Sequence, residues 1–135
     1  MSTATQLMAQ YAAYHRDRRN IATHFVGIPL IVFAVGALLA RPSFGVGTWM
    51  LTPAAIVWGL SSLWYLTRGN LALGLATSLA NLLLIAAALP LGQLETLPWL
   101  AWSLGTFIVG WAAQFIGHYY EGRKPAFVDD LRGLL

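Results

Sequence analysis

The chain has 135 residues, of which 58% are hydrophobic and only 10% are charged, and its formal net charge is +3. Its mean hydropathy is +0.64, whereas a typical soluble domain has about 25% charged residues. The stretch from 25 to 117 contains the charged side chains of Arg41, Arg68 and Glu95 and no others, which excludes water as its solvent. The absence of cysteine excludes disulfides and thiolate metal sites.

The first predicted element is an amphipathic helix over residues 4–19 that lies on the membrane surface. Its apolar and aromatic side chains and one histidine fall within about 120° of one another on a helical wheel. They are Leu7, Met8, Tyr11, Tyr14 and His15. The polar segment 16–20 interrupts this pattern, and Asn20 is predicted to cap the following helix. A turn there would let His15 and His24 face one point, because a continuous helix would hold them about 180° apart.

Four apolar runs follow, and each approaches the roughly 20 residues that a helix needs to cross a bilayer. They cover about 24–40, 49–66, 71–91 and 97–118. The predicted fold is therefore all-α: one integral membrane domain over 1–135, with about four transmembrane helices after the interfacial helix. Pro29 is expected to bend the first span, or to make it begin irregularly just beyond His24. Residues 119–135 are predicted to form a cytoplasmic tail.

The distribution of basic residues predicts the orientation. With four spans, Arg41 falls on one side of the membrane and all other basic residues fall on the other. These are Arg16, Arg18, Arg19, Arg68, Arg123, Lys124 and Arg132. The positive-inside rule then places both termini in the cytoplasm, in the inner membrane of a bacterium or the endoplasmic reticulum of a eukaryote. Because the basic residues flank apolar runs, membrane lipid is an expected partner and nucleic acid is not.

The three histidines of the chain lie at span ends that this topology places on the cytoplasmic side. His15 and His24 bracket the start of the first span, while His118 ends the fourth, on one helix face with Gln114 and Glu121. Imidazoles with one carboxylate and open positions suit a non-haem iron(II) oxygenase, and zinc accepts similar ligands. Ionisable groups are rare near membrane spans, so this joint placement predicts a metal site formed by the three histidines and Glu121.

Other polar residues have two interpretations each. Asn20 is either a plain helix cap or a donor to a ligand histidine, and Gln114 either holds substrate or bonds across helices. Arg19 and Lys124 either contact lipid headgroups or hold a substrate carboxylate. Tyr14 either anchors the chain at the interface or supports the site.

Two end motifs carry a resemblance to a known family. One is Tyr14-His15 followed by Asn20, His24, Gly27 and Pro29; the other is Gln114-Phe115-Ile116-Gly117-His118 followed by Glu121 and Pro125-Ala126. In these motifs the chain resembles the 2-hydroxy fatty acid dioxygenase family, over nearly its whole length. The resemblance implies an iron(II)-dependent enzyme that uses dioxygen to shorten a long-chain 2-hydroxy fatty acid by one carbon. It also implies that the histidines at 15, 24 and 118 bind the iron.

Two other classes of function stay open from the sequence. A non-enzymatic bundle is the first, either a transporter of metal or small molecules or a scaffold. Transport predicts ionisable groups near the bilayer midplane, whereas here they gather at one end. The second is a zinc-dependent lipid hydrolase, which would work without oxygen. In the oxygenase interpretation the acyl tail lies between helices, where Trp111 either lines the tail pocket or only packs.

Overall fold

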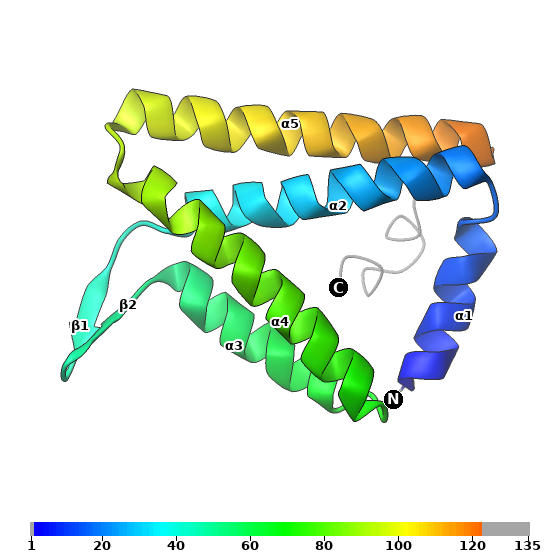
Figure 1. Ribbon diagram of the computed structural model, residues 1–135, viewed down its shortest axis with the longest axis horizontal. Helices are drawn as coiled ribbons and strands as arrows, with labels where there is room; N and C mark the ends of the chain where they lie inside the picture. Colours follow the sequence, from blue (N-terminus) through cyan, green and yellow to red (C-terminus); the bar gives the residue numbers. More distant parts are fainter. Residues whose placement is uncertain (1, 123–135) are drawn as a thin grey trace.

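The computed structural model describes residues 2–122, and that part of the chain is mostly helical (Figure 1). It contains five α-helices, one 3₁₀ helix and one antiparallel hairpin. In chain order these are α1 Ala4–Tyr14, α2 Arg18–Leu38, β1 Phe44–Val46, β2 Trp49–Leu51, α3 Pro53–Leu66, α4 Leu71–Ala88, η1 Leu89–Gln93 and α5 Thr96–Glu121.

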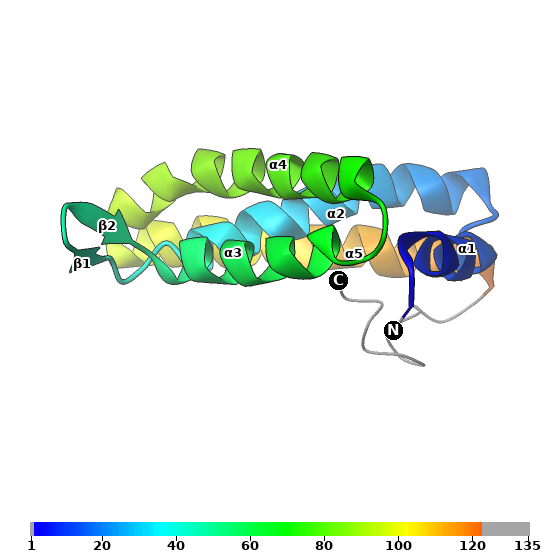
Figure 2. The same cartoon turned by 90° about the horizontal axis from the view of Figure 1, so that it is seen from below.

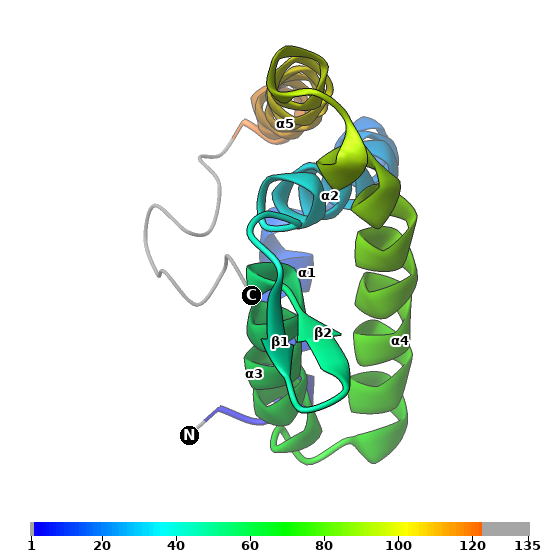
Figure 3. The ribbon, with the colours of Figure 1, turned by 90° about the vertical axis from the view of Figure 1, so that its left-hand side faces the viewer.

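Helices α2 and α5 run antiparallel and side by side (Figures 1 and 3). Their backbones approach closely because glycine faces glycine: a Cβ added to Gly27 would lie 2.8 Å from the carbonyl oxygen of Gly110. Farther along, the Trp99 indole donates to the carbonyl oxygen of Ala37 at 2.7 Å. Small residues of this kind let helices associate in lipid. The pairing places the start of α2 beside the end of α5.

Helices α3 and α4 form a second antiparallel pair on the side of α2 away from α5 (Figure 3). Within it the Trp58 indole donates to the carbonyl oxygen of Ser78 at 2.8 Å. The loop between the two helices reaches the start of α1 (Figure 2), where the backbone N–H of Ala4 donates to the carbonyl oxygen of Arg68 at 2.7 Å. The loop that carries Arg68 thus lies beside the start of α1.

Arg41 fixes the opposite end of the bundle. Its guanidinium donates to the carbonyl oxygens of Gly92, at 2.9 Å, and of Leu94. It also donates to the Thr96 hydroxyl at 3.2 Å and lies 4.4 Å above the centre of the Trp99 ring. The hairpin side of the bundle is therefore tied to η1 and to the start of α5.

Four apolar helices follow α1 in the described residues, as predicted, but three of them are long enough to cross a membrane. These three are Arg18–Leu38, Leu71–Gln93 and Thr96–Glu121. Helix α3 has 14 residues, so it is about 21 Å long at about 1.5 Å per residue, against a hydrocarbon core of about 30 Å. The predicted helix over 49–66 is wrong at its start, because β2 occupies Trp49–Leu51 and Thr52 caps α3.

The first span also begins earlier than predicted. Helix α2 starts at Arg18 instead of near His24, and Pro29 lies inside it. Its N-cap is Asp17, whose carboxylate accepts from the backbone N–H of Arg19 at 2.8 Å. The prediction that Asn20 caps this helix is therefore wrong, since that residue lies in the first turn of α2.

Helix α1 ends at Tyr14, five residues before the predicted end at 19, because the backbone at His15 leaves helical geometry with φ −133° and ψ 67°. Its location on a membrane surface stays a prediction, and so does the cytoplasmic location of both termini. Of the predicted tail over 119–135, residues 119–121 belong to α5, and residues after 122 lie outside the described range.

Candidate metal centre

A short turn between α1 and α2 brings two histidines together. His15 is the C-cap of α1, and α2 begins only three residues later at Arg18. The ring centroids of His15 and His24 are 4.3 Å apart, and the ring planes are nearly perpendicular, at 82°. The turn predicted between these histidines is present.

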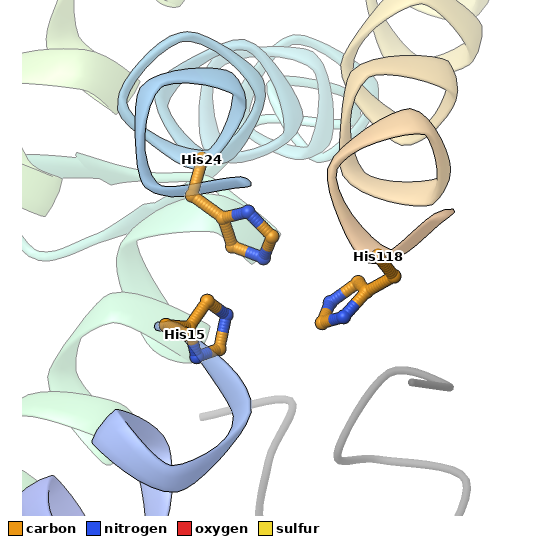
Figure 4. Close-up of side chains that lie close together, drawn as sticks. All are labelled: His15, His24 and His118. Carbon is orange, nitrogen blue, oxygen red and sulfur yellow. The ribbon is translucent and has the colours of Figure 1, made fainter. Parts of the chain in front are cut away.

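His118 completes the cluster from the last full turn of α5. Its ring centroid lies 4.9 Å from that of His24 and 5.4 Å from that of His15, and all three rings point toward one another (Figure 4). One ring nitrogen from each histidine lies within 4.8 Å of the other two. Less than a tenth of each residue is exposed. The antiparallel packing of α2 on α5 creates this meeting point from the two ends of the sequence.

Backbone carbonyls hold two of the rings. Nδ1 of His15 lies 2.6 Å from the carbonyl oxygen of Tyr11, and Nδ1 of His24 lies 2.9 Å from that of Asn20. A carbonyl oxygen only accepts, so in each neutral imidazole Nδ1 carries the proton and Nε2 keeps its lone pair. The Tyr11 ring also stacks on His15 with centroids 3.7 Å apart. Both Nε2 atoms are thereby prepared as ligands, the usual arrangement of metal-binding histidine.

The cluster contains buried polar atoms without partners in the described part of the chain. Nε2 of His15 and Nδ1 of His118 are both buried and make no hydrogen bond. Buried polar atoms nearly always have a partner, and leaving one unsatisfied costs about 1–3 kcal/mol. A metal ion would satisfy these nitrogens, because neutral imidazole is the commonest metal ligand in proteins. The donor set therefore fits a metal, and three histidines suit zinc or iron(II).

The Glu121 carboxylate lies beside the three histidines without joining their group of ligand atoms. It accepts from the backbone N–H of Arg16 at 2.9 Å and from that of Asp17 at 2.7 Å. It also accepts from the side-chain amide of Asn20 at 3.1 Å. These donors lie at the start of α2, where the helix dipole favours an anion. The arrangement differs from the predicted direct ligand: Glu121 ties the end of α5 to the turn that carries His15.

Asn20 connects these parts and is fully buried. Its side-chain amide donates to Glu121 and to the carbonyl oxygen of Tyr14, both at 3.1 Å, while its own carbonyl oxygen holds His24. The sequence left two roles open, a helix cap and a donor to a ligand histidine; the side chain instead donates to Tyr14 and Glu121, and the backbone carbonyl oxygen of Asn20 is what contacts His24. Gly117 makes room for the Asn20 side chain, since a Cβ there would lie 2.5 Å from Oδ1 of Asn20.

A cleft of about 470 Å³ opens from the cluster between α1 and α2. Its lining residues are Tyr11, Ala12, His15, Ile21, His24, Phe25, Ile28 and Pro29. Sequence reasoning missed this cleft, although Ile21, Phe25 and Ile28 share one helix face with His24, which is the signal that could have revealed it. Trp111, the predicted candidate for a tail pocket, is absent from the lining and instead contacts the rings of Phe107 and Phe115.

Comparison with known proteins identifies the family to which this chain belongs. The family described as "2-hydroxy-palmitic acid dioxygenase Mpo1-like" matches residues 1–135, the whole chain. The chain belongs to the Mpo1-like family. The 2-hydroxy-palmitic acid dioxygenase MPO1 of Saccharomyces cerevisiae is 31% identical over 123 residues, which are 90% of this chain and 66% of the yeast protein. The match thus spans just under two thirds of that relative's length. No solved structure matches the present chain. The family resemblance predicted from the two end motifs is confirmed.

In this member of the Mpo1-like family, the remaining candidate residues lie around the cluster in different ways. Gln114 is buried one turn before His118, between α5 and α2, and its Nε2 makes no hydrogen bond within the described residues. Arg19 pairs with Asp17 at 3.0 Å and lies over the Tyr120 ring, and this pairing holds the pKa of the Asp17 carboxyl below its usual value. Lys124 lies outside the described residues.

Proposed function

We propose that this chain is an iron(II)-dependent membrane dioxygenase that converts a long-chain 2-hydroxy fatty acid into the fatty acid one carbon shorter. The observation that carries the proposal is the buried cluster of His15, His24 and His118, with unsatisfied ring nitrogens where the rings meet. Family membership supports it, because the yeast relative is named a 2-hydroxy-palmitic acid dioxygenase.

The reaction balances with dioxygen as the single oxidant. The bond between C1 and C2 of the acid breaks, C1 leaves as carbon dioxide, and C2 becomes the new carboxyl carbon. The four electrons removed from the acid reduce one dioxygen, and the products are the shortened fatty acid, carbon dioxide and one water. Iron(II), when bound by the three histidines, would supply open coordination positions at which the hydroxy acid and dioxygen meet.

The side chains around the histidines have supporting roles in this proposal. The carbonyl oxygens of Tyr11 and Asn20 keep the Nδ1 protons of His15 and His24 in place, so that the Nε2 lone pairs stay available. Glu121 is a positioning residue here, in place of the direct ligand predicted from the sequence. The burial of all three rings keeps bulk water away from the reacting groups.

The fold fits a substrate that arrives from a bilayer. The fold includes three helices that are long and apolar enough to cross a membrane. The histidine site lies where the end of α1, the start of α2 and the end of α5 meet. We infer that the chain is an integral membrane protein in which the shorter helix α3 crosses the bilayer together with the three long helices, so that both termini lie in the cytoplasm, in keeping with the charge asymmetry of its loops. A long-chain 2-hydroxy acid would then present its headgroup at the depth of the histidines while its tail stays in hydrocarbon.

The test is turnover by the purified chain, followed by mass spectrometry of the products. A long-chain 2-hydroxy acid should give the acid one carbon shorter only when both dioxygen and iron(II) are present. The corresponding unsubstituted fatty acid should react poorly, because it lacks the hydroxyl group needed for chelation. Unimpaired turnover without oxygen, or with zinc in place of iron, would exclude the proposal in favour of a zinc hydrolase. No turnover at any chain length would favour a transporter or scaffold.

A further inference from the structure

The cleft between α1 and α2 is lined by three polar aromatic side chains and otherwise by apolar ones. The polar side chains are those of His15, His24 and Tyr11. Its volume of about 470 Å³ is within the range of about 300–1,000 Å³ that is typical of small-molecule sites. A ligand that fits must therefore carry one metal-binding end and an apolar body.

The apolar part of the cleft follows one face of α2. Ile21, Phe25 and Ile28 are spaced four and three residues apart, so they lie on one side of the helix together with His24. Ile21 lies about one turn before His24, and the face from His24 to Pro29 extends about 8 Å beyond it at about 1.5 Å per residue, away from the start of the helix.

This face of α2 is left open by the rest of the described fold. The exposed fractions are 37% for Ile21, 78% for Phe25 and 40% for Ile28. Helix α5 packs instead on the face of α2 that carries Gly27. Helix α1 meets the start of α2 at a steep angle and does not run alongside it (Figure 1). An acyl chain in the bilayer can therefore reach the cleft sideways, without leaving hydrocarbon.

We propose that this cleft binds the acyl chain of the substrate, and that Phe25 and Ile28 determine which chain lengths are accepted. The inference rests on the proposed function and adds to it the residues that select the substrate. The cleft is continuous with the histidine cluster, because His15 and His24 both line the cleft and belong to the group of possible metal ligands. This continuity identifies the occupant. A bulk phospholipid offers only phosphate and ester oxygens at the histidines, whereas a 2-hydroxy acid can chelate one metal ion through its hydroxyl and its carboxylate together.

The position of Ile28 gives a sharp test of chain-length selection. It lies one helical turn beyond His24, so an Ile28→Trp substitution would fill the distal cleft and leave the histidine end unchanged. Turnover of a long-chain 2-hydroxy acid should fall at least about tenfold relative to a short-chain one, the scale of discrimination that apolar pockets achieve. Val26→Trp is the matched control, since Val26 is exposed on the same helix and does not line the cleft. Equal chain-length profiles in the two variants would overturn the inference.

A second measurement uses the wild-type protein and does not depend on turnover. A long-chain 2-hydroxy acid with a diazirine at its tail is photolysed with the iron-loaded wild-type protein in the absence of dioxygen, and the labelled peptides are mapped. Labels should fall on α1 and on the segment from Phe25 to Pro29. Labels on α3, α4 or the Trp111 face of α5 would contradict the inference. If the cleft is labelled but the protein turns over no 2-hydroxy acid in air, the binding site is supported and the proposed reaction is wrong. If turnover is normal but the labels lie elsewhere, the proposed reaction is supported and the binding site is wrong.

Discussion

A single methyl group at Gly117 tests whether the contact between α2 and α5 sets the geometry of the histidines. In a Gly117→Ala variant the new Cβ would lie 2.1 Å from Oγ1 of Thr23, 2.5 Å from Oδ1 of Asn20 and 3.3 Å from Cα of Asn20. Neither side chain is free to turn away. Asn20 holds Tyr14 and Glu121 at 3.1 Å each, and the Thr23 hydroxyl donates to the carbonyl oxygen of Asn20 at 2.7 Å.

The two helix ends must therefore separate by about 1 Å, and overpacking of this kind costs about 1–3 kcal/mol of unfolding free energy. His118 is the next residue, so it moves away from His24 by a similar distance. Metal sites tolerate deviations of only about 0.2 Å in ligand distances. We expect the affinity for iron(II) to fall at least about tenfold, as it does when groups that orient metal ligands are lost.

The assay is chelator competition for the metal, combined with thermal unfolding of the purified protein in detergent. Gly105→Ala is the matched control, because it makes the same change on the same helix and its Cβ would meet nothing within 4 Å. The control should keep wild-type metal affinity and gain up to about 1 kcal/mol of stability from the better helix former. If the Gly117 and Gly105 variants bind metal equally well, the close approach of α2 and α5 does not set the site.

Two further predictions follow from the contacts of Glu121 and from the charge pattern. Glu121→Gln keeps the shape but loses the negative charge that holds Arg16, Asp17 and Asn20, so metal affinity should fall about 10- to 100-fold as measured by chelator competition. A complete loss of metal, equal to that in His118→Ala, would instead identify Glu121 as a direct ligand. Topology reporters fused at Ser43 and at the C-terminus should give opposite signals, and matching signals would contradict the proposed orientation.

The helical, membrane-type fold could be predicted from local patterns in the sequence, and the histidine cluster could be predicted from the order of the apolar runs along the chain. Apolar runs of nearly spanning length predict helices whatever their neighbours are. Three histidines at ends that the topology places together predict a joint site without any coordinates. The pairing of α2 with α5 confirms that geometric step, since His118 meets His24 across it.

The start of α3 shows where local pattern is ambiguous. The apolar run from Trp49 to Leu51 is compatible with helix or strand, and short runs of this kind cannot be told apart by periodicity. Thr52 followed by Pro53 was the better signal, because a threonine cap before a proline in the first turn is typical of a helix start.

The roles of Glu121 and Asn20 depend on packing that the sequence does not contain. From its spacing, Glu121 shares a helix face with His118, which makes it a reasonable ligand. Whether its oxygens meet a metal or the N–H groups at the start of α2 depends on how far α5 extends past that start. The same applies to Asn20. Asp17 and Asn20 are both residue types that cap helices well; in the structure Asp17 is the N-cap, and the Asn20 side chain contacts Glu121 instead. The cleft likewise depends on the angle between α1 and α2.

The most direct test of the central claim, that His15, His24 and His118 together bind one metal ion, is X-ray absorption spectroscopy of the iron-loaded protein. The account predicts one iron per chain, with the scattering pattern of three imidazole ligands. It also predicts that each single substitution by alanine depletes the metal while the protein stays folded. A spectrum without imidazole ligands, or full metal occupancy in all three variants, would contradict it.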